Sequence, residues 1–300
     1  MTDTAATPRR VLRGMLLISI AVILFSVMDT ISKYLTRYYP VTNVLWMRYL
    51  FHTLLIVAVV APRHGLALVR TERLGIQVLR GLLLAGASLL FVTAIKYMPL
   101  AEATAIQFLS PLLVTLLAVL FLKETVELSR WIAILAGFSG VLIIIRPGSG
   151  IFTWASLLPL GTATLFASYQ VLTRHFAGRE SPYTLIFYPG IIGMLLLALT
   201  LPFAWVPPRS LSHVAMLAVA GMIGGSSHLI LIRAYELAPA SRLAPFSYTQ
   251  LIWVTLAGYI VFDNFPDGLS LAGIAILTTS GVYIAARQHL QDRKRAPSPE

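Results

Sequence analysis

The chain has 300 residues, of which 57% are hydrophobic and 12% are charged, and its mean hydropathy is +0.80. Soluble domains are about half apolar and about a quarter charged, so this composition excludes an ordinary soluble protein and indicates a membrane protein. The formal net charge of +11 comes from basic residues in short clusters between apolar runs, and no nucleic-acid-binding motif accompanies them. Membrane topology explains this charge better than nucleic acid, so we expect the lipid bilayer and a small-molecule substrate as partners and no nucleic acid.

Ten apolar runs follow one another along the chain, and the connections between them are too short for a soluble domain. Each run approaches the length of about 20 residues that crosses the hydrocarbon core as a helix. Arg9, Arg10 and Arg13 precede the first run, but no small-residue cleavage site follows it, so we expect a retained helix and not a signal peptide. The runs cover roughly residues 14–35, 42–61, 74–97, 101–122, 131–145, 154–173, 183–204, 211–235, 241–262 and 269–286.

A sequence repeat divides the chain into two five-helix units. Residues 81–124 return as residues 221–264 at a shift of 140, so that Gly81 is matched by Gly221 and Pro99 by Pro239. Five is odd, so the second unit must enter the membrane from the opposite side. We therefore expect an N-terminal tail (1–13), a first unit (14–146), a linker (147–153), a second unit (154–287) and a C-terminal tail (288–300).

The basic residues predict the orientation. With the N-terminus in the cytoplasm, most lysines and arginines outside the spans fall on the cytoplasmic side. This bias predicts that both termini lie in the cytoplasm. The all-α fold expected from the sequence is thus ten transmembrane helices in two inverted five-helix repeats.

Short motifs in the first half resemble a known family. They are Ala94-Ile-Lys-Tyr97, Pro99-Leu-Ala-Glu-Ala103, Ser110-Pro111 and Leu122-Lys-Glu124, followed by Trp131, Gly137 and Gly140. They resemble the EamA-type family of the drug/metabolite transporter superfamily, over about residues 14–146 and 154–287. The resemblance implies ten helices, two inverted repeats and export, and the chain is most similar to the aromatic amino acid exporters of bacterial inner membranes. Gln250-Leu251 stands where the family usually has a proline, which predicts a straighter ninth helix than the fourth.

Polar residues within apolar spans should face the interior of the bundle, because a polar group in lipid costs free energy. Polar and aromatic residues at helical spacing in six of the runs are therefore expected to converge on a cavity between the halves. The expected lining residues are Ser26, Asp29, Ser88, Phe91, Gln107, Ser110, Tyr169, Gln170, His228, Tyr248, Gln250 and Trp253.

Each of these residues also has a purely structural interpretation. Asp29 can pair with Arg48 in the second run, and His228 can be a buried neutral histidine instead of a proton carrier. The serines can serve helix packing, and Tyr169 and Trp253 can be core residues. Asp29 and His228 are the credible proton sites, so proton antiport and uncoupled transport are both open.

Glycines and prolines suggest where the helices could slide or bend. Glycines let neighbouring backbones approach closely, and a proline inside a helix removes a backbone donor. Static close packing is the alternative. The expected hinge or packing residues are Gly81, Gly86, Pro111, Gly221, Gly224, Gly225 and Pro245.

We predict a secondary transporter that exports amino acids, mostly apolar ones including aromatic ones, by alternating access in the bacterial inner membrane. Export of other metabolites or drugs, or a scaffold or receptor without flux, are the alternatives. The sequence lacks cysteine, GxSxG, HExxH, a P-loop and clustered carboxylates, so we expect no enzyme, no metal site and no cofactor. The oligomeric state is not defined, and a monomer is compatible with the sequence.

Overall fold

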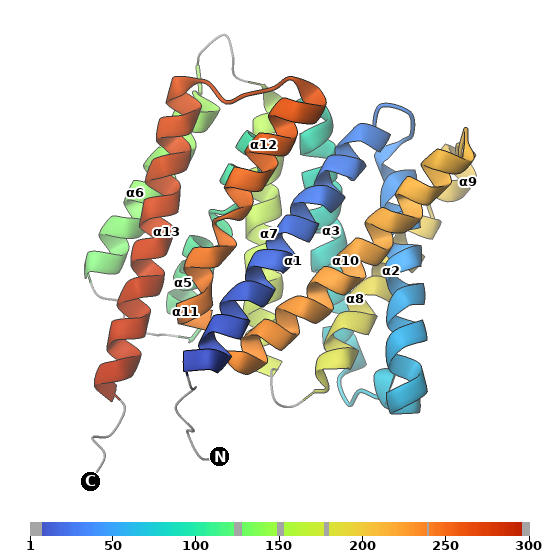
Figure 1. Ribbon diagram of the computed structural model, residues 1–300, viewed down its shortest axis with the longest axis horizontal. Helices are drawn as coiled ribbons and strands as arrows, with labels where there is room; N and C mark the ends of the chain where they lie inside the picture. Colours follow the sequence, from blue (N-terminus) through green and yellow to red (C-terminus); the bar gives the residue numbers. More distant parts are fainter. Residues whose placement is uncertain (1–7, 123–127, 149–152, 177–179, 239, 296–300) are drawn as a thin grey trace.

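The computed structural model describes residues 8–122, 128–148, 153–176, 180–238 and 240–295, and every regular element in these ranges is a helix (Figure 1). In chain order these are α1 (Pro8–Leu35), α2 (Val41–His64), η1 (Gly65–Leu68), α3 (Leu74–Tyr97), α4 (Leu100–Gln107), α5 (Ser110–Leu122), α6 (Leu128–Ile145), η2 (Trp154–Leu157), α7 (Leu158–Phe176), α8 (Pro182–Ala198), α9 (Leu201–Ala204), α10 (Leu211–Leu237), α11 (Ala240–Ser247), α12 (Gln250–Phe262) and α13 (Gly268–Arg295).

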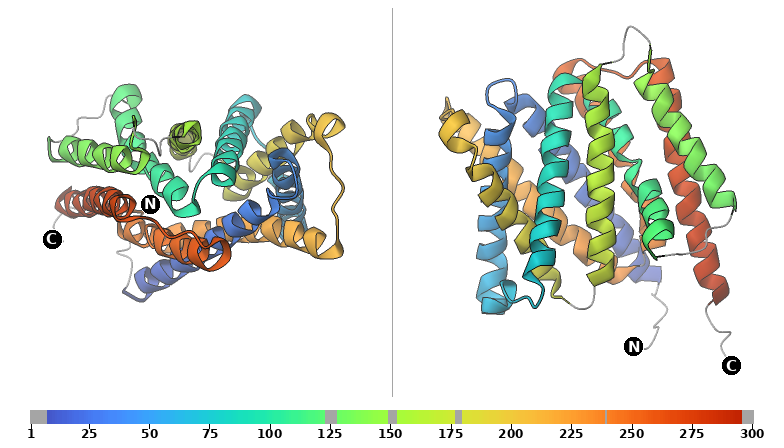
Figure 2. Two further views of the ribbon diagram at one scale, coloured as in Figure 1. Left: turned by 90° about the horizontal axis from the view of Figure 1, so that it is seen from above. Right: turned by 180° about the vertical axis from the view of Figure 1, so that it is seen from behind.

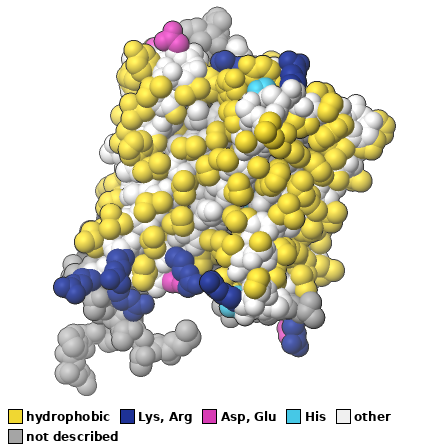
Figure 3. Space-filling view, turned by 45° about the vertical axis from the view of Figure 1, so that its right-hand side comes forward, with side chains coloured by type: hydrophobic (Ala, Val, Ile, Leu, Met, Phe, Trp, Pro, Cys, Tyr) yellow, Lys and Arg dark blue, Asp and Glu magenta, His cyan; other side chains and the backbone are white. Residues whose placement is uncertain are grey.

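The helices have the length and composition of membrane spans. Seven segments within the described residues are long and apolar enough to cross a membrane, and shorter apolar helices cover Trp131–Ile145 and Pro182–Ala198. On the face shown in Figure 3, charged side chains gather at the two ends of the molecule and a broad hydrophobic belt separates them. This confirms the prediction of an all-helical, multi-pass membrane protein. The count of ten passages stays a prediction.

The fourth apolar run is broken in the middle, into α4 and α5. Pro111 has no N–H to donate to the carbonyl of Gln107, four residues earlier, and α4 ends at that glutamine. Pro111 itself fits the first turn of α5, where a free N–H is not needed. Tight turns close the gap, since the amide nitrogen of Leu109 lies 3.0 Å from the oxygen of Ile106.

The ninth run is broken at the matching place, between α11 and α12, so the prediction of a straighter ninth helix is wrong. The amide of Leu251 donates to the carbonyl of Tyr248, three residues earlier, instead of continuing the helix. The Thr249 hydroxyl also donates to the carbonyl of Phe246 at 2.6 Å. The ninth run thus breaks although Leu251, and not a proline, stands at the position that matches Pro111.

Helix boundaries recur at matching positions of the sequence repeat. α3 ends at Tyr97, and α10 ends at its repeat mate, Leu237. The two breaks also match, since α4 ends at Gln107 and α11 ends at the equivalent Ser247. The seventh run is less regular, because α8 stops at Ala198 and the short α9 follows instead of one helix to residue 204. The repeat in the sequence is thus also a repeat of helix ends and helix breaks.

Matching helices run in opposite directions. α1 begins and α13 ends at the same end of the bundle, which we name the terminal end, and the other is the opposite end (Figure 1). α1 runs from the terminal end to the opposite end, whereas α7 runs the other way (Figure 2). α1 packs along α10 and α7 packs along α3, while α6 and α13 form a pair at one edge of the bundle (Figure 2).

Glycines allow α2 to lie very close to α10. A Cβ placed on Gly221 would lie 2.6 Å from the backbone oxygen of Arg48 in α2. Gly224 faces α1 instead, where a Cβ would lie 3.0 Å from the sulfur of Met28. At the matching contact in the other half, a Cβ on Gly81 would lie 2.5 Å from Ile192. Gly86 and Gly225 likewise face leucine side chains. The predicted hinge glycines therefore lie at helix–helix contacts, and movement there stays a prediction.

An ionic network joins three helix ends at the opposite end of the bundle. Arg146, after α6, donates to the carboxylate of Asp267, which precedes α13. The Ser270 amide also donates to that carboxylate at 2.8 Å, and the Ser270 hydroxyl donates to Glu102 of α4 at 2.9 Å. Hydrogen bonds from Arg146 and Ser270 hold the pKa of the Asp267 carboxyl well below its usual value.

This network predicts a pH-dependent stability. Because the folded-state pKa of Asp267 is depressed, its ionised form adds stability above about pH 4, the ordinary pKa of aspartate, and this contribution is lost as the pH falls toward the folded-state value. We expect the difference in Tm between the wild type and Asp267→Asn to be largest near pH 7 and to shrink below pH 4. Thermal unfolding in detergent over this pH range measures it, and a difference independent of pH would contradict the assignment.

Candidate functional site

A group of polar and aromatic side chains lies inside the bundle between α1, α2 and α10. α1 contributes Asp29, α2 contributes Arg48, Tyr49 and His52, and α10 contributes His228. We name these five residues the central cluster. Three of them (Asp29, Tyr49 and His52) are buried, and Arg48 and His228 are half-buried.

Asp29 is a buried carboxylate, with only 5% of the residue exposed. Arg48 acts on it electrostatically, yet no ion pair or hydrogen bond joins the Asp29 side chain to any other residue that the structure describes. The simple Asp29–Arg48 pair that the sequence left open is therefore not formed as a direct contact. A buried carboxylate without a partner favours a cation, a proton or water beside it.

The two histidines of the central cluster lie close together, and Phe25 of α1 packs against one of them. The rings of His52 and His228 lie 5.9 Å apart, and the ring of Phe25 lies 5.1 Å from that of His228, both edge to face. Nε2 of His52 is buried and has no hydrogen-bond partner among the described residues. A Cβ on Gly190 of α8 would lie 2.9 Å from the His52 ring, so a glycine is needed to admit this side chain.

Tyr49 links the central cluster to α3. Its hydroxyl donates to Ser88 Oγ at 2.9 Å, and the Arg48 guanidinium lies 5.9 Å from the centre of its ring. Ser88, a predicted lining residue, thus accepts a hydrogen bond from α2. Arg48 and Asp29 together place one positive and one negative group in the same region of the bundle interior.

The two helix breaks meet in the core. The ring of Phe108, at the first break, lies 4.8 Å from that of Tyr248, its repeat mate at the second break. The predicted residues Gln107, Ser110 and Gln250 flank the breaks as helix ends. Broken helices that cross near the centre are typical of secondary transporters, in which they surround the substrate site.

A buried arginine joins α3 to α7 and α8. Arg80 is fully buried, and its guanidinium donates to the side-chain oxygens of Thr173 (3.0 Å), Gln77 (2.5 Å) and Tyr169 (3.4 Å) and to the carbonyl oxygen of Leu185 (3.3 Å). The Arg80 guanidinium also lies over the Tyr169 ring, 5.0 Å from the centre of that ring. Tyr169, which the sequence predicts to line the substrate cavity, thus contacts Arg80, and its contact with substrate stays a prediction.

The remaining predicted lining residues lie apart from these groups. Ser26 donates to the carbonyl of Val22 in its own helix, and Phe91 is packed in the main hydrophobic core. Gln170 is half-buried. Trp253 is 40% exposed on α12, a helix that is apolar on all sides. The structure thus brings Asp29, Ser88 and His228 to α2, and Gln107, Ser110, Tyr248 and Gln250 to the breaks.

Sequence reasoning missed most of what α2 and α3 contribute. The sequence alone indicates Arg48 only as a partner of Asp29, and it does not single out Tyr49, His52 or Arg80 as site residues. A signal was present, since Arg48 and Arg80 lie within apolar runs, where ionisable residues are rare and usually functional or paired. The structure adds that a row of α2 side chains faces the interior between glycines of α8 and α10.

The Arg80 network predicts that lysine cannot replace arginine. A lysine ammonium has three donors on one nitrogen and cannot reach acceptors arranged around a planar guanidinium. Arg80→Lys should lower stability by about 1–3 kcal/mol, because buried oxygens lose their donors. Thermal unfolding in detergent measures this, with the exposed Arg70→Lys as the matched control. Equal Tm values for the two variants would show that the network does not hold the helices.

Comparison with known proteins gives one matching family model. The model of the EamA-like transporter family matches residues 12–146 and again residues 153–286. The chain is 28% identical to the S-adenosylmethionine uptake transporter of Rickettsia prowazekii (strain Madrid E), over 91% of this chain and 92% of that protein. It is 31% identical to the riboflavin transporter of Rhizobium johnstonii, over 98% of each chain. It is 26% identical to the pseudopaline exporter CntI of Pseudomonas aeruginosa (strain UCBPP-PA14), over 91% of this chain and 95% of that protein.

Proposed function

The chain belongs to the EamA-like transporter family and is a small-molecule transporter, and from this premise we propose that its substrates are small zwitterions that carry an aromatic or heteroaromatic ring. The observation that carries this proposal is the central cluster. It offers a carboxylate, a guanidinium and aromatic rings within one buried region.

Each part of the cluster suits one part of such a substrate. The Asp29 carboxylate, which has no partner among the described side chains, would bind an ammonium group, and Arg48 would bind a carboxylate. The rings of Phe25 and His228 offer an edge-to-face surface for an aromatic substituent. Aromatic amino acids, which the sequence resemblance implied, are the simplest members of this class.

The names of the relatives widen the substrate class. S-adenosylmethionine combines an amino-acid zwitterion with a purine ring, and riboflavin has a fused heteroaromatic ring but no zwitterion. The first molecule fits every part of the central cluster, whereas the second fits only the rings. We therefore propose both aromatic amino acids and zwitterions with a heteroaromatic ring as substrates. Neutral flavins are the second candidate class.

We further propose ten passages in two inverted halves. The repeated helix boundaries, the opposite directions of α1 and α7, and the two family matches all support this arrangement. α4 with α5, and α11 with α12, then form one broken passage each. The excess of arginine at the terminal end favours placing that end in the cytoplasm of a bacterial inner membrane.

Movement of one half against the other would open the central cluster to each side in turn. The helix breaks and the glycine contacts of α2 with α10 are the places where the packing allows such movement. The relatives include an uptake transporter and an exporter, so their names favour neither direction. Export, which the sequence resemblance implied, stays our prediction for this chain.

Counterflow into proteoliposomes tests the substrate class. Vesicles loaded with unlabelled phenylalanine, S-adenosylmethionine or riboflavin are diluted into a trace of the same compound in labelled form. We expect transient accumulation of the two zwitterions and little of riboflavin. Accumulation of riboflavin alone would replace our class with neutral flavins, and no counterflow with any of the three would contradict the proposal.

A further inference from the structure

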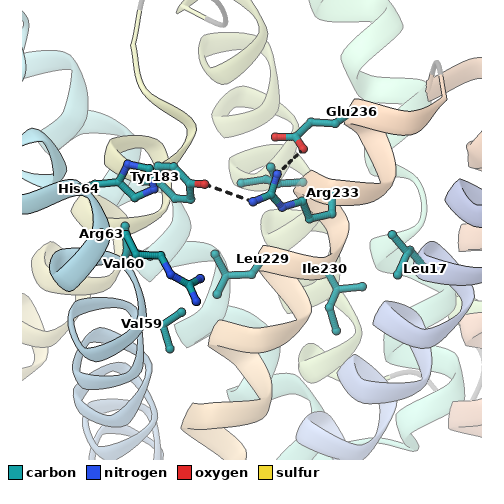
Figure 4. A pocket seen from close by; sticks show the side chains of 11 residues that line it. Leu17, Val59, Val60, Arg63, His64, Tyr183, Leu229, Ile230, Arg233 and Glu236 are labelled. Carbon is teal, nitrogen blue, oxygen red and sulfur yellow. Dashed lines mark hydrogen bonds and ion pairs between the residues drawn. The ribbon is translucent and has the colours of Figure 1, made fainter.

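A lateral groove lies at the terminal end of the bundle, apart from the central cluster. It is a cavity of about 370 Å³ between α2 and α10, bordered by Tyr183 of α8 and Leu17 of α1 (Figure 4). It shares no residue with the central cluster. Val59, Arg63 and Arg233 at its border are exposed, so the groove is accessible from outside the bundle.

The groove has an apolar part and a basic part. Hydrophobic side chains of α1, α2 and α10 line the part nearer the middle of the membrane, whereas charged side chains stand at the end of the helices. The apolar residues are Leu17, Val59, Val60, Leu229, Ile230 and Ile232, and the charged ones are Arg63, Arg233 and Glu236. A ligand that fills the groove must therefore be amphipathic, with its charged group at the membrane surface.

The two arginines differ in what they already bind. Arg233 donates to Glu236 at 2.8 Å and to the Tyr183 hydroxyl at 3.3 Å, so its charge is offset within the chain. Arg63 makes no hydrogen bond or ion pair with any described residue, and its guanidinium extends between Val59 and Leu229 into the groove (Figure 4). Arg63 thus provides an uncompensated positive charge beside an apolar wall.

We propose that this groove binds one anionic phospholipid, with its phosphate on Arg63 and an acyl chain along Val59, Leu229 and Ile230. Basic pockets between membrane helices recognise anionic headgroups, and each arginine near the membrane surface contributes about 1 kcal/mol. The apolar wall beside Arg63 can hold an acyl chain that is joined to the phosphate, and a free phosphate ion has no such chain. Arg233 is already bound to Glu236 and Tyr183 at the border of the groove, so the lipid headgroup would bind to Arg63.

Native mass spectrometry of the delipidated full chain tests the proposal. The protein is titrated with dioleoyl phosphatidylglycerol, with dioleoyl phosphatidylcholine, and with inorganic phosphate. We expect one phosphatidylglycerol to bind in preference to phosphatidylcholine, and no binding of phosphate. Arg63→Gln should weaken phosphatidylglycerol binding about fivefold. Arg70→Gln, which removes an exposed charge at the same end but outside the groove, is the matched control and should change little.

A second variant tests the groove without changing the charge. Val59→Trp fills the apolar part with a larger side chain at an exposed position and should also reduce binding of phosphatidylglycerol. The proposal is overturned if the wild type binds both lipids equally, if Arg70→Gln loses as much binding as Arg63→Gln, or if Val59→Trp binds phosphatidylglycerol as the wild type does. If inorganic phosphate binds with the same dependence on Arg63, the groove is a simple anion site and not a lipid site.

Discussion

Asp29→Asn is expected to raise the KM of counterflow for a zwitterionic substrate by about 10- to 100-fold. A hydrogen bond to a charged group contributes about 1.5–3 kcal/mol, and asparagine keeps the shape of aspartate while removing its charge. Asp29 has no partner among the described side chains, so the change breaks no contact in the empty protein. The effect should therefore fall on the substrate and not on folding, and the Tm in detergent should stay near that of the wild type.

Two comparisons identify the role of Asp29. The KM of a transported analogue without the ammonium group should change little in Asp29→Asn, because that analogue has no charge for Asp29 to bind. Glu72→Gln, at an exposed carboxylate outside the central cluster, is the control for loss of one negative charge. If counterflow is unchanged and only uptake driven by a pH gradient is lost, Asp29 carries a proton instead of binding substrate. Unchanged transport in both assays would show that Asp29 neither binds substrate nor carries a proton.

Gly221→Ala is expected to lower stability by about 1–3 kcal/mol and to impair transport. The added Cβ would lie 2.6 Å from the backbone oxygen of Arg48 and 2.6 Å from Cβ of Phe51, so α2 must move away from α10. The backbone of Arg48 cannot rotate away from the added Cβ, whereas the end of a flexible side chain could. The movement would also displace Arg48 and His52, which α2 presents to the central cluster. Thermal unfolding in detergent and counterflow measure the two effects.

Gly75→Ala is the matched control for this packing argument. Gly75 also lies in a helix, but a Cβ placed there would meet nothing within 4 Å. The same substitution should therefore be neutral, or stabilise by up to about 1 kcal/mol by reducing the freedom of the unfolded chain. If Gly221→Ala is as well tolerated as Gly75→Ala, the close approach of α2 and α10 does not constrain the protein.

Much of the fold follows from the sequence, because apolar runs of membrane length leave few alternatives. The third run, predicted at residues 74–97, coincides with α3, and the first run ends with α1 at Leu35. The breaks within the fourth and ninth runs were less predictable. Pro111 marks the first break, but no proline stands at the second, where the amide of Leu251 donates to the carbonyl of Tyr248 in a tight turn. A hydropathy pattern does not distinguish such a turn from a continuous helix.

The candidate site was harder to predict than the fold. Helical spacing groups side chains on one face but does not say which face points inward when a helix is apolar all round. Trp253 on such a helix is 40% exposed, and its expected contact with substrate stays a prediction. The sequence does not single out His52 and Tyr49 of α2, because the glycines that they pack against belong to α8 and α10 and are distant in the sequence. Such contacts depend on tertiary packing.

The proposed transport mechanism rests on two inverted halves, and the absence of cysteine from the chain makes this arrangement directly testable. Glu72→Cys and Ser212→Cys place single thiols at exposed positions that match in the repeat, before α3 and at the start of α10. Each variant is labelled in oriented membrane vesicles with a membrane-impermeant maleimide. We expect the first thiol to react only from the cytoplasmic side and the second only from the outer side. Reaction of both thiols from the same side would contradict the inverted arrangement, and with it a site shared between the halves.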